Sequence, residues 1–468
     1  MKYKPILGFS GINRQVSNFL VKDGEFSDSQ NFRTQKIGVL KKAGDYEAYC
    51  AQITASMPIY SGVEHILANG TREHFVAING SSNAGIYKNI TGTWTSQSQS
   101  LTKDNNVRMA YFPPLLTTFA VNYADATRSY SAGSWSTSTN VTSAPKAKDV
   151  MAFGDRIYLF NCVVGSDAFR DRAYRSSIVD TSITWDTVND WITFEDEIVG
   201  AGKMGEHMFV GCKSSCYLWT LNDEKIPIST QGLVGINAIA SYGRLVFYGT
   251  RDGIYAHDGG NETKISEPVE DYWKAISEAN IGNVSFGIDG NSLFVYIGTV
   301  TVDGISMPTT VLEYDILKND WNKLNYGLTI NSMHNFIDST NGKSLYAGDR
   351  NGYVWRLNAS GAQNTAVIPS YFESDWMYGD DPKEIKTFYE LWGYGKELSA
   401  LKVSYKVDDR DWESIGQLNG SRDFCKFKAR GYRIKFLLEE SSKNNMYEVH
   451  QLEYGYEPEY TENKDKEG

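Results

Sequence analysis

Two similar hairpins far apart in the sequence constrain the fold more than any other feature. The segment "YGTRDGIYAHDG" (residues 248–259) and the segment "YAGDRNGYVWRLN" (residues 346–358) each read as a strand, a polar turn and a second, aromatic-rich strand. A chain repeats one such unit when each copy buries its apolar face against the next. Further copies at a regular spacing are therefore expected in the rest of the sequence.

Seven segments carry a matching second strand. Their successive spacings are 44, 44, 44, 36, 58 and 42 residues, and the long one contains the insertion "TVDGISMPTT". Four strands in every 40–45 residues is the pattern of a β-propeller. Seven markers favour seven blades, although the 36- and 58-residue spacings leave a count of six blades open. The alternative fold is an irregular β-sandwich. The marker residues are Ile86, Tyr130, Tyr174, Leu218, Ile254, Leu312 and Val354.

Turn residues and tryptophans refine this prediction. The pairs Asp252-Gly253 and Asn351-Gly352 predict two-residue type I′ turns, which need positive φ at both central positions. Tryptophans near the ends of the repeats predict outer strands that flank the next blade. These are Trp94, Trp135 and Trp321.

One helix interrupts the strands, at residues 267–279. We predict Ser266 as its N-cap, because a serine hydroxyl can accept from the first free N–H groups of a helix. Val269, Trp273 and Ile276 share one helix face and are expected to pack on a blade.

The two ends of the chain differ from the middle. Residues 1–49 are polar and rich in turns, and we expect them to wrap a neighbouring copy, to complete a blade, or to cap their own propeller. Residues 50–370 form the predicted propeller. Residues 371–458 contain longer alternating strands, which predict an antiparallel β-sandwich-like domain. Residues 459–468 form a charged tail.

Composition and motifs indicate no catalytic, cofactor or metal site. The net charge of −11 argues against a general nucleic-acid binder, the five cysteines form no metal-ligand pattern, and we read no signal peptide or membrane anchor. His257 and Asp258 look catalytic at first sight. However, the second hairpin has Leu357 and Asn358 there, which favours a scaffold role. We therefore expect a protein that is not an enzyme and is folded in a reducing cytoplasm.

A glycosidase is the enzymatic alternative, because propellers can hold the two facing carboxylates that sugar hydrolysis needs. The runs "FEDE" (residues 194–197) and Asp380-Asp381 supply carboxylates. A contiguous acidic run has no reason to frame a sugar, so solvated loops explain both better.

The N-terminal segment resembles the opening of the tail-nozzle proteins of short-tailed bacteriophages, which are also called tail tubular or packaged-DNA stabilisation proteins. The sequence departs from the family pattern at Ser10, where a glycine is usual, and at Lys42-Ala43, where Arg-Pro is usual. The segment around the predicted helix and the C-terminal strands are also similar to this family. The matching positions are Gly11, Asn13, Leu20, Gly24, Glu25, Asp28, Asn31, Gly38, Leu40, Lys41 and Gly44.

The resemblance implies a structural virion protein of the phage neck or tail, assembled in the host cytoplasm. It implies a homo-oligomeric ring, a hexamer, that contacts the portal adaptor and neck proteins and the tail fibre or needle (plug) proteins. The ring would extend the DNA channel, retain the packaged genome and allow its ejection. Because a basic wall would bind phosphates and slow the DNA, we expect acidic side chains toward the lumen. The alternative is a receptor- or carbohydrate-binding tail propeller with exposed clustered Trp and Tyr. We expect the seven Gly, Asn and Glu positions of the motif, 11, 13, 24, 25, 31, 38 and 44, to act in assembly.

Overall fold

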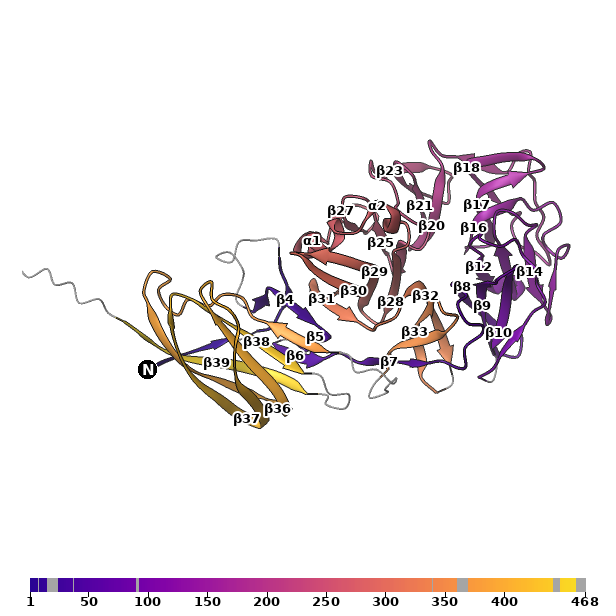
Figure 1. Ribbon diagram of the computed structural model, residues 1–468. Helices are drawn as coiled ribbons and strands as arrows, with labels where there is room; N and C mark the ends of the chain where they lie inside the picture. Colours follow the sequence, from indigo (N-terminus) through magenta and orange to yellow (C-terminus); the bar gives the residue numbers. More distant parts are fainter. Residues whose placement is uncertain are drawn as a thin grey trace, which may run out of the picture.

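Seven four-stranded antiparallel sheets form a β-propeller, and a nine-stranded sheet forms a second domain beside it (Figure 1). The computed structural model describes residues 1–6, 8–14, 24–36, 38–89, 92–338, 340–359, 369–440 and 447–459. The family-motif position Leu20 and the tail from residue 460 lie outside the described residues. The prediction of an all-β propeller is confirmed, and its blade count is seven.

The first four blades follow one another along the chain. Blade 1 contains β8 (Ile59–Ile66), β9 (Arg72–Asn79), β10 (Ala84–Asn89) and β11 (Trp94–Ser96). Blade 2 contains β12 (Arg108–Phe112), β13 (Thr117–Val121), β14 (Arg128–Ser131) and β15 (Ser134–Ser136), with the 3-10 helix η1 (Pro113–Leu115). Blade 3 contains β16 (Lys146–Phe153), β17 (Arg156–Val164), β18 (Asp167–Arg175) and β19 (Trp191–Thr193). Blade 4 contains β20 (Ile198–Met204), β21 (His207–Cys212), β22 (Cys216–Trp219) and β23 (Lys225–Ser229).

The last three blades include the insertions and the ring closure. Blade 5 contains β24 (Ile239–Tyr242), β25 (Leu245–Gly249), β26 (Ile254–His257) and β27 (Glu262–Lys264). Blade 6 contains β28 (Ser285–Asp289), β29 (Ser292–Val302), β30 (Ile305–Asp315) and β31 (Asp320–Asn325). Blade 7 contains β32 (Ile330–Asp338), β33 (Gly342–Asp349), β34 (Val354–Ala359) and, from the N-terminal segment, β7 (Asp45–Ala48).

The ring closes in two ways. The first strand of each blade is innermost, and each inner strand contacts the next, including β32 of blade 7 with β8 of blade 1. In addition, β7 pairs with β34 as the outermost strand of blade 7, so residues from near the start of the chain complete the last blade. Closure in this form leaves no open end in the ring of sheets.

All seven marker residues lie in the third strand of their blade and are buried. Third strands pack between neighbouring blades, which is why their apolar residues recur with the period of the repeat. The predicted outer-strand tryptophans also lie as expected, with Trp94 in β11, Trp135 in β15 and Trp321 in β31.

The predicted type I′ turns are wrong. Neither Asp252 nor Gly253 has a positive φ, and in the second copy only Gly352 does, at 85°. Each hairpin has a four-residue loop instead, closed in blade 5 by a hydrogen bond from Thr250 N to the Gly253 carbonyl (2.8 Å). A longer loop relieves the requirement for two left-handed residues.

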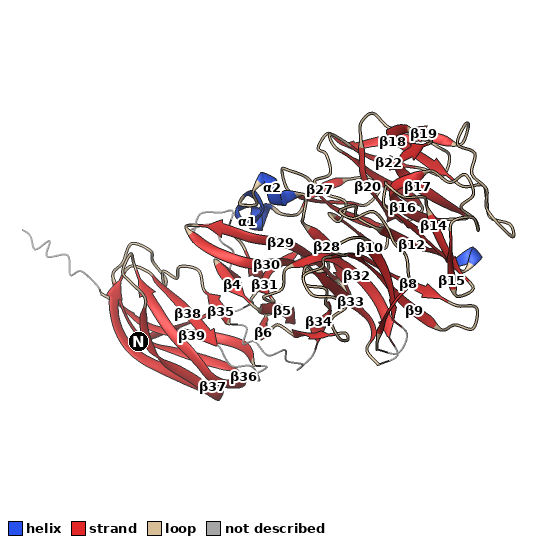
Figure 2. Cartoon of the chain, turned by 45° about the vertical axis from the view of Figure 1, so that its right-hand side comes forward, coloured by secondary structure: helices blue, strands red, loops and turns tan. Residues whose placement is uncertain are grey.

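The helical insertion is shorter and more broken than predicted. It consists of the 3-10 turn η2 (Glu267–Val269) and two short helices, α1 (Glu270–Lys274) and α2 (Glu278–Ile281), beside blade 6 (Figure 2). The prediction of Ser266 as a side-chain cap is wrong, because its Oγ accepts from Ile254 N (2.9 Å) in the neighbouring strand. The predicted apolar face is confirmed, since Val269, Trp273 and Ile276 are all buried.

The second domain is one antiparallel sheet that is nearly closed on itself. Its C-terminal strands are β35 (Ser370–Glu373), β36 (Lys386–Val407), β37 (Glu413–Gly431), β38 (Ile434–Glu440) and β39 (Glu448–Pro458). The first half of β36 pairs with β39 and the second half with β38, while β37 runs along its other edge. The long β36–β37 hairpin therefore belongs to both layers, which gives one sheet a sandwich-like form.

The N-terminal segment is divided between the two domains. Strands β1 (Lys2–Ile6), β4 (Asp28–Gln30), β5 (Phe32–Lys36) and β6 (Val39–Lys42) join the second domain's sheet. A short parallel pair, β2 (Gly11–Ile12) and β3 (Glu25–Phe26), lies between the domains, and β2 contacts β31 of blade 6. The chain thus passes between the two domains once between β6 and β7 and again between β34 and β35.

Candidate functional site

The family-motif positions gather at the junction between the two domains. Gly11 has a φ of 104°, and a Cβ there would lie 3.0 Å from the Trp321 carbonyl oxygen of blade 6. Glycine at this position therefore lets β2 approach the outer strand of the propeller. Asn13 Nδ2 donates to Glu25 Oε2 (2.9 Å), and the Gly24 carbonyl accepts from Ser10 N (2.8 Å). These contacts hold the described residues of β2 and β3 side by side.

Asn31 connects three segments that are far apart in the sequence. Its backbone N–H donates to the Lys323 carbonyl (2.9 Å), and its Oδ1 accepts from Asn325 N (2.8 Å), both in blade 6. Its Nδ2 donates to the Pro369 carbonyl (2.9 Å), and its own carbonyl accepts from Ala43 N (2.8 Å). Asn31 adopts a left-handed φ of 59°, which asparagine tolerates better than most residues. Gly38 lies in the turn between β5 and β6, and Gly44 lies directly before β7.

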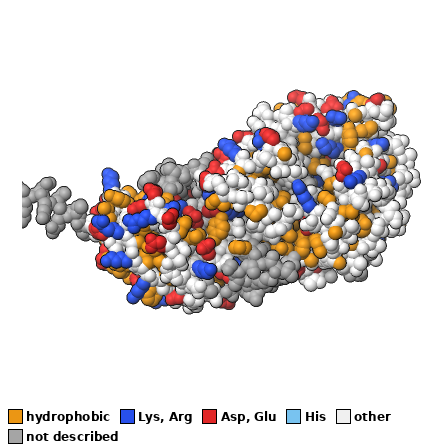
Figure 3. All heavy atoms as spheres, in the orientation of Figure 1, with side chains coloured by type: hydrophobic (Ala, Val, Ile, Leu, Met, Phe, Trp, Pro, Cys, Tyr) orange, Lys and Arg blue, Asp and Glu red, His pale blue; other side chains and the backbone are white. Residues whose placement is uncertain are grey.

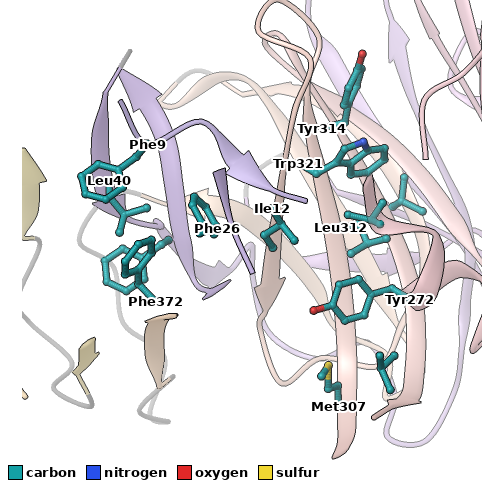
Figure 4. Close-up of a cluster of buried hydrophobic side chains, with 14 of the residues drawn as sticks. Phe9, Ile12, Phe26, Leu40, Tyr272, Met307, Leu312, Tyr314, Trp321 and Phe372 are labelled. Atoms are coloured by element: carbon teal, nitrogen blue, oxygen red, sulfur yellow. The ribbon is translucent and has the colours of Figure 1, made fainter. Parts of the chain in front are cut away.

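A continuous apolar core fills the junction (Figure 4). Phe372 of β35 makes edge-to-face contacts with Phe9 (centroids 5.4 Å apart) and Phe26 (5.1 Å) of the N-terminal segment. Ile12 of the same segment and Trp321 of blade 6 belong to the same cluster. Because the domains share one core, burial of apolar surface opposes their separation.

A buried charged cluster lies next to this core. Lys323 Nζ of β31 contacts Asp28 Oδ1 (2.7 Å) and Oδ2 (2.8 Å) of β4, and its side chain is 1% exposed. The hydroxyls of Tyr272 and Tyr371 each donate to the same carboxylate, at 2.7 and 2.8 Å. The cluster therefore joins blade 6, α1, the N-terminal segment and the C-terminal sheet.

Burial sets the protonation of this cluster. Loss of hydration lowers the pKa of Lys323, and the neighbouring Asp28 carboxylate opposes that shift. Burial and then the Asp28 charge raise the pKa of both Tyr272 and Tyr371. Both tyrosines thus remain hydrogen-bond donors to the carboxylate.

A second buried ion pair crosses the junction farther along β5. Arg33 Nε donates to Glu313 Oε2 of β30 at 2.6 Å, and their side chains are 4% and 6% exposed. The guanidinium also lies over the Phe294 ring and bonds to Asn358 of blade 7. Two buried ion pairs and a shared apolar core make the junction a rigid connection.

A cavity of about 290 Å³ opens beside the charged cluster. Its charged lining includes Arg14, Asp28, Asp303, Asp375 and Lys435, from both domains and the N-terminal segment. Burial raises the pKa of Asp375, and its Oδ1 has no hydrogen-bond partner. Within the described ranges, no group of three or more His, Cys, Asp or Glu side chains is placed to hold a metal ion.

Side chains bridge the propeller axis at the N-terminal ends of the inner strands. Arg108 of blade 2 contacts Asp149 of blade 3 (3.2 Å) and Asn237, which precedes β24 of blade 5 (2.6 Å). Asn237 in turn donates to the Asn331 carbonyl of blade 7 (3.1 Å), and Asp149 accepts from Ala201 N of blade 4 (3.0 Å). A direct bond between blades 2 and 5 closes the axis at this level. DNA therefore has no path along the axis of one propeller.

A larger cavity of about 660 Å³ lies at the seam between blades 7 and 1. Its lining includes Tyr49, Arg72, His74, Asp338 and Arg356. The Tyr49 hydroxyl and His74 Nδ1 are 2.6 Å apart. The Arg72 guanidinium is paired with Glu64, and the Arg356 guanidinium is paired with Glu47. The sequence offered no signal for this cavity, because the closing segment and blade 1 are remote from blade 7 in the chain.

The acidic runs and His257 occupy structural positions. Glu197 Oε2 lies 2.7 Å from Lys213 Nζ in the propeller, whereas Asp380 Oδ2 lies 2.8 Å from Lys2 Nζ in the other domain. The two runs therefore do not face each other across a substrate site. His257 Nδ1 accepts from Gly259 N (2.9 Å) within its own turn.

Comparison with known proteins finds only distant structural likenesses. No family model and no curated protein matches the sequence. Among solved structures, the chain is similar to YCF48 bound to D1 peptide (11% identity, TM-score 0.42), covering 68% of this chain and 97% of that one. It is also similar to the AfRom2 CNH domain (9%, TM-score 0.39, covering 67% and 99%). A third is Saccharomyces cerevisiae Sqt1 (8%, TM-score 0.40, covering 71% and 99%). Likeness at this level carries no argument about function.

No described helix is both long and apolar enough to cross a bilayer.

Proposed function

We propose that this chain is a structural subunit of the neck or tail of a short-tailed bacteriophage. Several copies, six by the family resemblance, would form a ring below the portal and its adaptor. The ring extends the DNA channel, retains the packaged genome and opens for ejection. In this assembly the DNA passes between the copies and not through a propeller, because the propeller axis is bridged by Arg108 and Asn237.

The position of the N-terminal motif carries this proposal. The described motif residues hold together a junction that involves blade 6, blade 7 and the C-terminal sheet. A ring that contains pressurised DNA needs subunits whose domains do not separate under load. The shared core and the buried pairs Lys323–Asp28 and Arg33–Glu313 supply that rigidity.

The proposal is tested by the assembly state of the purified full-length chain. Mass photometry and negative-stain microscopy are performed on the chain alone and with isolated phage neck particles. Rings, or incorporation onto the necks, support a nozzle subunit. A monomer that ignores the necks and binds a glycan array supports a receptor-binding propeller, and release of sugars from a glycan supports a glycosidase.

A further inference from the structure

One face of the edge strand β37 carries a cationic stripe, defined here as Arg422, Phe424, Lys426 and Lys428. These exposed side chains alternate with the buried Cys425 and the half-buried Asp423 and Phe427, so they point away from the core. Over the described residues, β37 pairs only with β36, which leaves the stripe at the margin of the sheet. The stripe is therefore accessible to a partner.

Aromatic rings hold the stripe in place. Phe424 stacks on Trp392 of β36 (centroids 4.4 Å apart, planes at 22°), and the two are cross-strand neighbours. The Arg422 guanidinium lies over Trp392 (4.9 Å) and over Tyr394 (5.4 Å). Stacking of this kind fixes long side chains before a partner binds, which lowers the entropy lost on binding.

Two carboxylates act electrostatically on the stripe: Glu390, the cross-strand neighbour of Lys426, and Glu459, which lies near Lys428. Arg430, the next outward cation, is bound by Glu459 at 2.8 Å, but Arg422, Lys426 and Lys428 form no ion pair with a described residue. The chain as a whole has a net charge of −11, so the stripe is a local exception. Figure 3 shows Lys and Arg side chains among hydrophobic and acidic ones on the C-terminal domain.

The composition of the stripe favours a protein partner over a nucleic acid. Single-stranded nucleic acids bind by stacking bases on free aromatic faces, whereas the Trp392 ring is already covered by Phe424 and Arg422. Aromatic residues and arginine together are enriched in the cores of protein interfaces. Exposed cations without a close ion pair then favour an acidic surface on that protein.

We propose that the cationic stripe binds an acidic surface of a second copy of this chain and so forms the contact between ring neighbours. The strongly acidic remainder of the chain supplies the complementary charge. A contact between two different surfaces of identical copies is head-to-tail, and such contacts close into a ring when the rotation between neighbours divides a full turn, and otherwise form open filaments. This inference rests on the proposed function, since it names the surface by which the proposed ring would form.

The test compares two full-length charge-reversal variants with wild type. Arg422→Glu/Lys428→Glu changes the stripe, and Arg244→Glu/Lys343→Glu applies the same change in charge to exposed propeller residues. Circular dichroism and a thermal melt confirm that each is folded, and Arg422→Gln/Lys428→Gln gives a milder change. Association is measured by mass photometry at about 50 mM and about 500 mM NaCl, because salt screens exposed charges.

We expect the stripe reversal to weaken association by about tenfold or more, the glutamine variant to weaken it less, and salt to weaken wild type. The propeller variant should assemble as wild type does. If rings form equally well with the stripe reversed, the inference is overturned and the proposed function stands. If no variant or wild type associates, alone or on neck particles, both are overturned. Loss of duplex-DNA binding with unchanged association would assign the stripe to nucleic acid and also overturn the inference.

Discussion

Removing the carboxylate of the junction cluster should loosen the connection between the two domains. Asp28→Asn keeps the size of the side chain but leaves the Lys323 ammonium, 1% exposed, without its counterion. Three weaker acceptors remain: the hydroxyl of Tyr371 (2.8 Å), the hydroxyl of Tyr272 (3.3 Å) and the sulfur of Met307 (3.6 Å). Breaking a buried ion pair from one side typically costs about 3–5 kcal/mol. We expect Asp28→Asn to lower the free energy needed to open the junction by about 3–5 kcal/mol.

Hydrogen–deuterium exchange of the peptide containing Asn31 measures this loss locally. The Asn31 N–H is bonded to the Lys323 carbonyl and exchanges only when the junction opens. Since each 1.4 kcal/mol is a factor of ten, exchange in Asp28→Asn should accelerate roughly 100- to 4,000-fold. Replacing both partners, in Asp28→Asn/Lys323→Met, removes the unpaired charge and should restore much of the protection.

An exposed ion pair provides the matched control. Asp409 is 93% exposed and lies 3.1 Å from Arg433 in the same domain, so Asp409→Asn should cost no more than about 1 kcal/mol. Equal exchange rates in Asp28→Asn and Asp409→Asn would refute the argument that the buried cluster locks the junction. Failure of the double variant to recover any protection would refute the role assigned to the unpaired ammonium.

Three further predictions concern the propeller. Burial lowers the pKa of His334 from an ordinary 6.5 to about 3, so between those pH values the unfolded chain binds more protons than the folded chain. The free energy of unfolding should therefore fall as the pH drops below about 6.5, by up to about 1.4 kcal/mol per pH unit. His334→Leu should flatten this pH dependence, as measured by urea titrations. Gly232→Ala would place a Cβ 1.7 Å from a backbone carbonyl oxygen, so it should reduce the free energy of unfolding by about 1–3 kcal/mol and lower the melting temperature. Gly260→Ala, whose Cβ would lie 3.6 Å from the nearest heavy atom, should leave the melting temperature unchanged. Arg108→Ala leaves the buried Asp149 without its cation and should cost about 1–3 kcal/mol in denaturant unfolding; an unchanged midpoint would show that the axial network is dispensable.

The repeat could be predicted from the sequence because its signal is local. Residues such as Tyr130 and Leu312 are buried in the third strand of their blades, and the same burial recurs in the third strand of each blade. The pairing of β7 with β34 leaves no comparable signal, since "DYEA" is short and its partner lies about three hundred residues away. For this reason, blade completion remained one of three alternatives for residues 1–49.

The charged cluster was also beyond the reach of sequence reasoning. Lys323 lies in "NDWNKL", where an alternating lysine is normally a solvent-facing strand residue. Asp28 belonged to the family motif, but nothing in the motif indicates its partner. The turn prediction failed for a related reason, because loop length depends on how strands pair and not only on the turn dipeptide.

The closing strand determines when this protein can become native during its synthesis. Residues 45–48 leave the ribosome early, but β34 follows only after roughly 15–60 s at ordinary elongation rates. Until then blade 7 has no outer strand, and β1 and β4–β6 wait still longer for the C-terminal sheet. The propeller therefore cannot close before β34 has been made, and the second domain cannot close before β39 has followed. The N-terminal segment must stay unaggregated while most of the chain is translated, and its removal would take strands from both domains together.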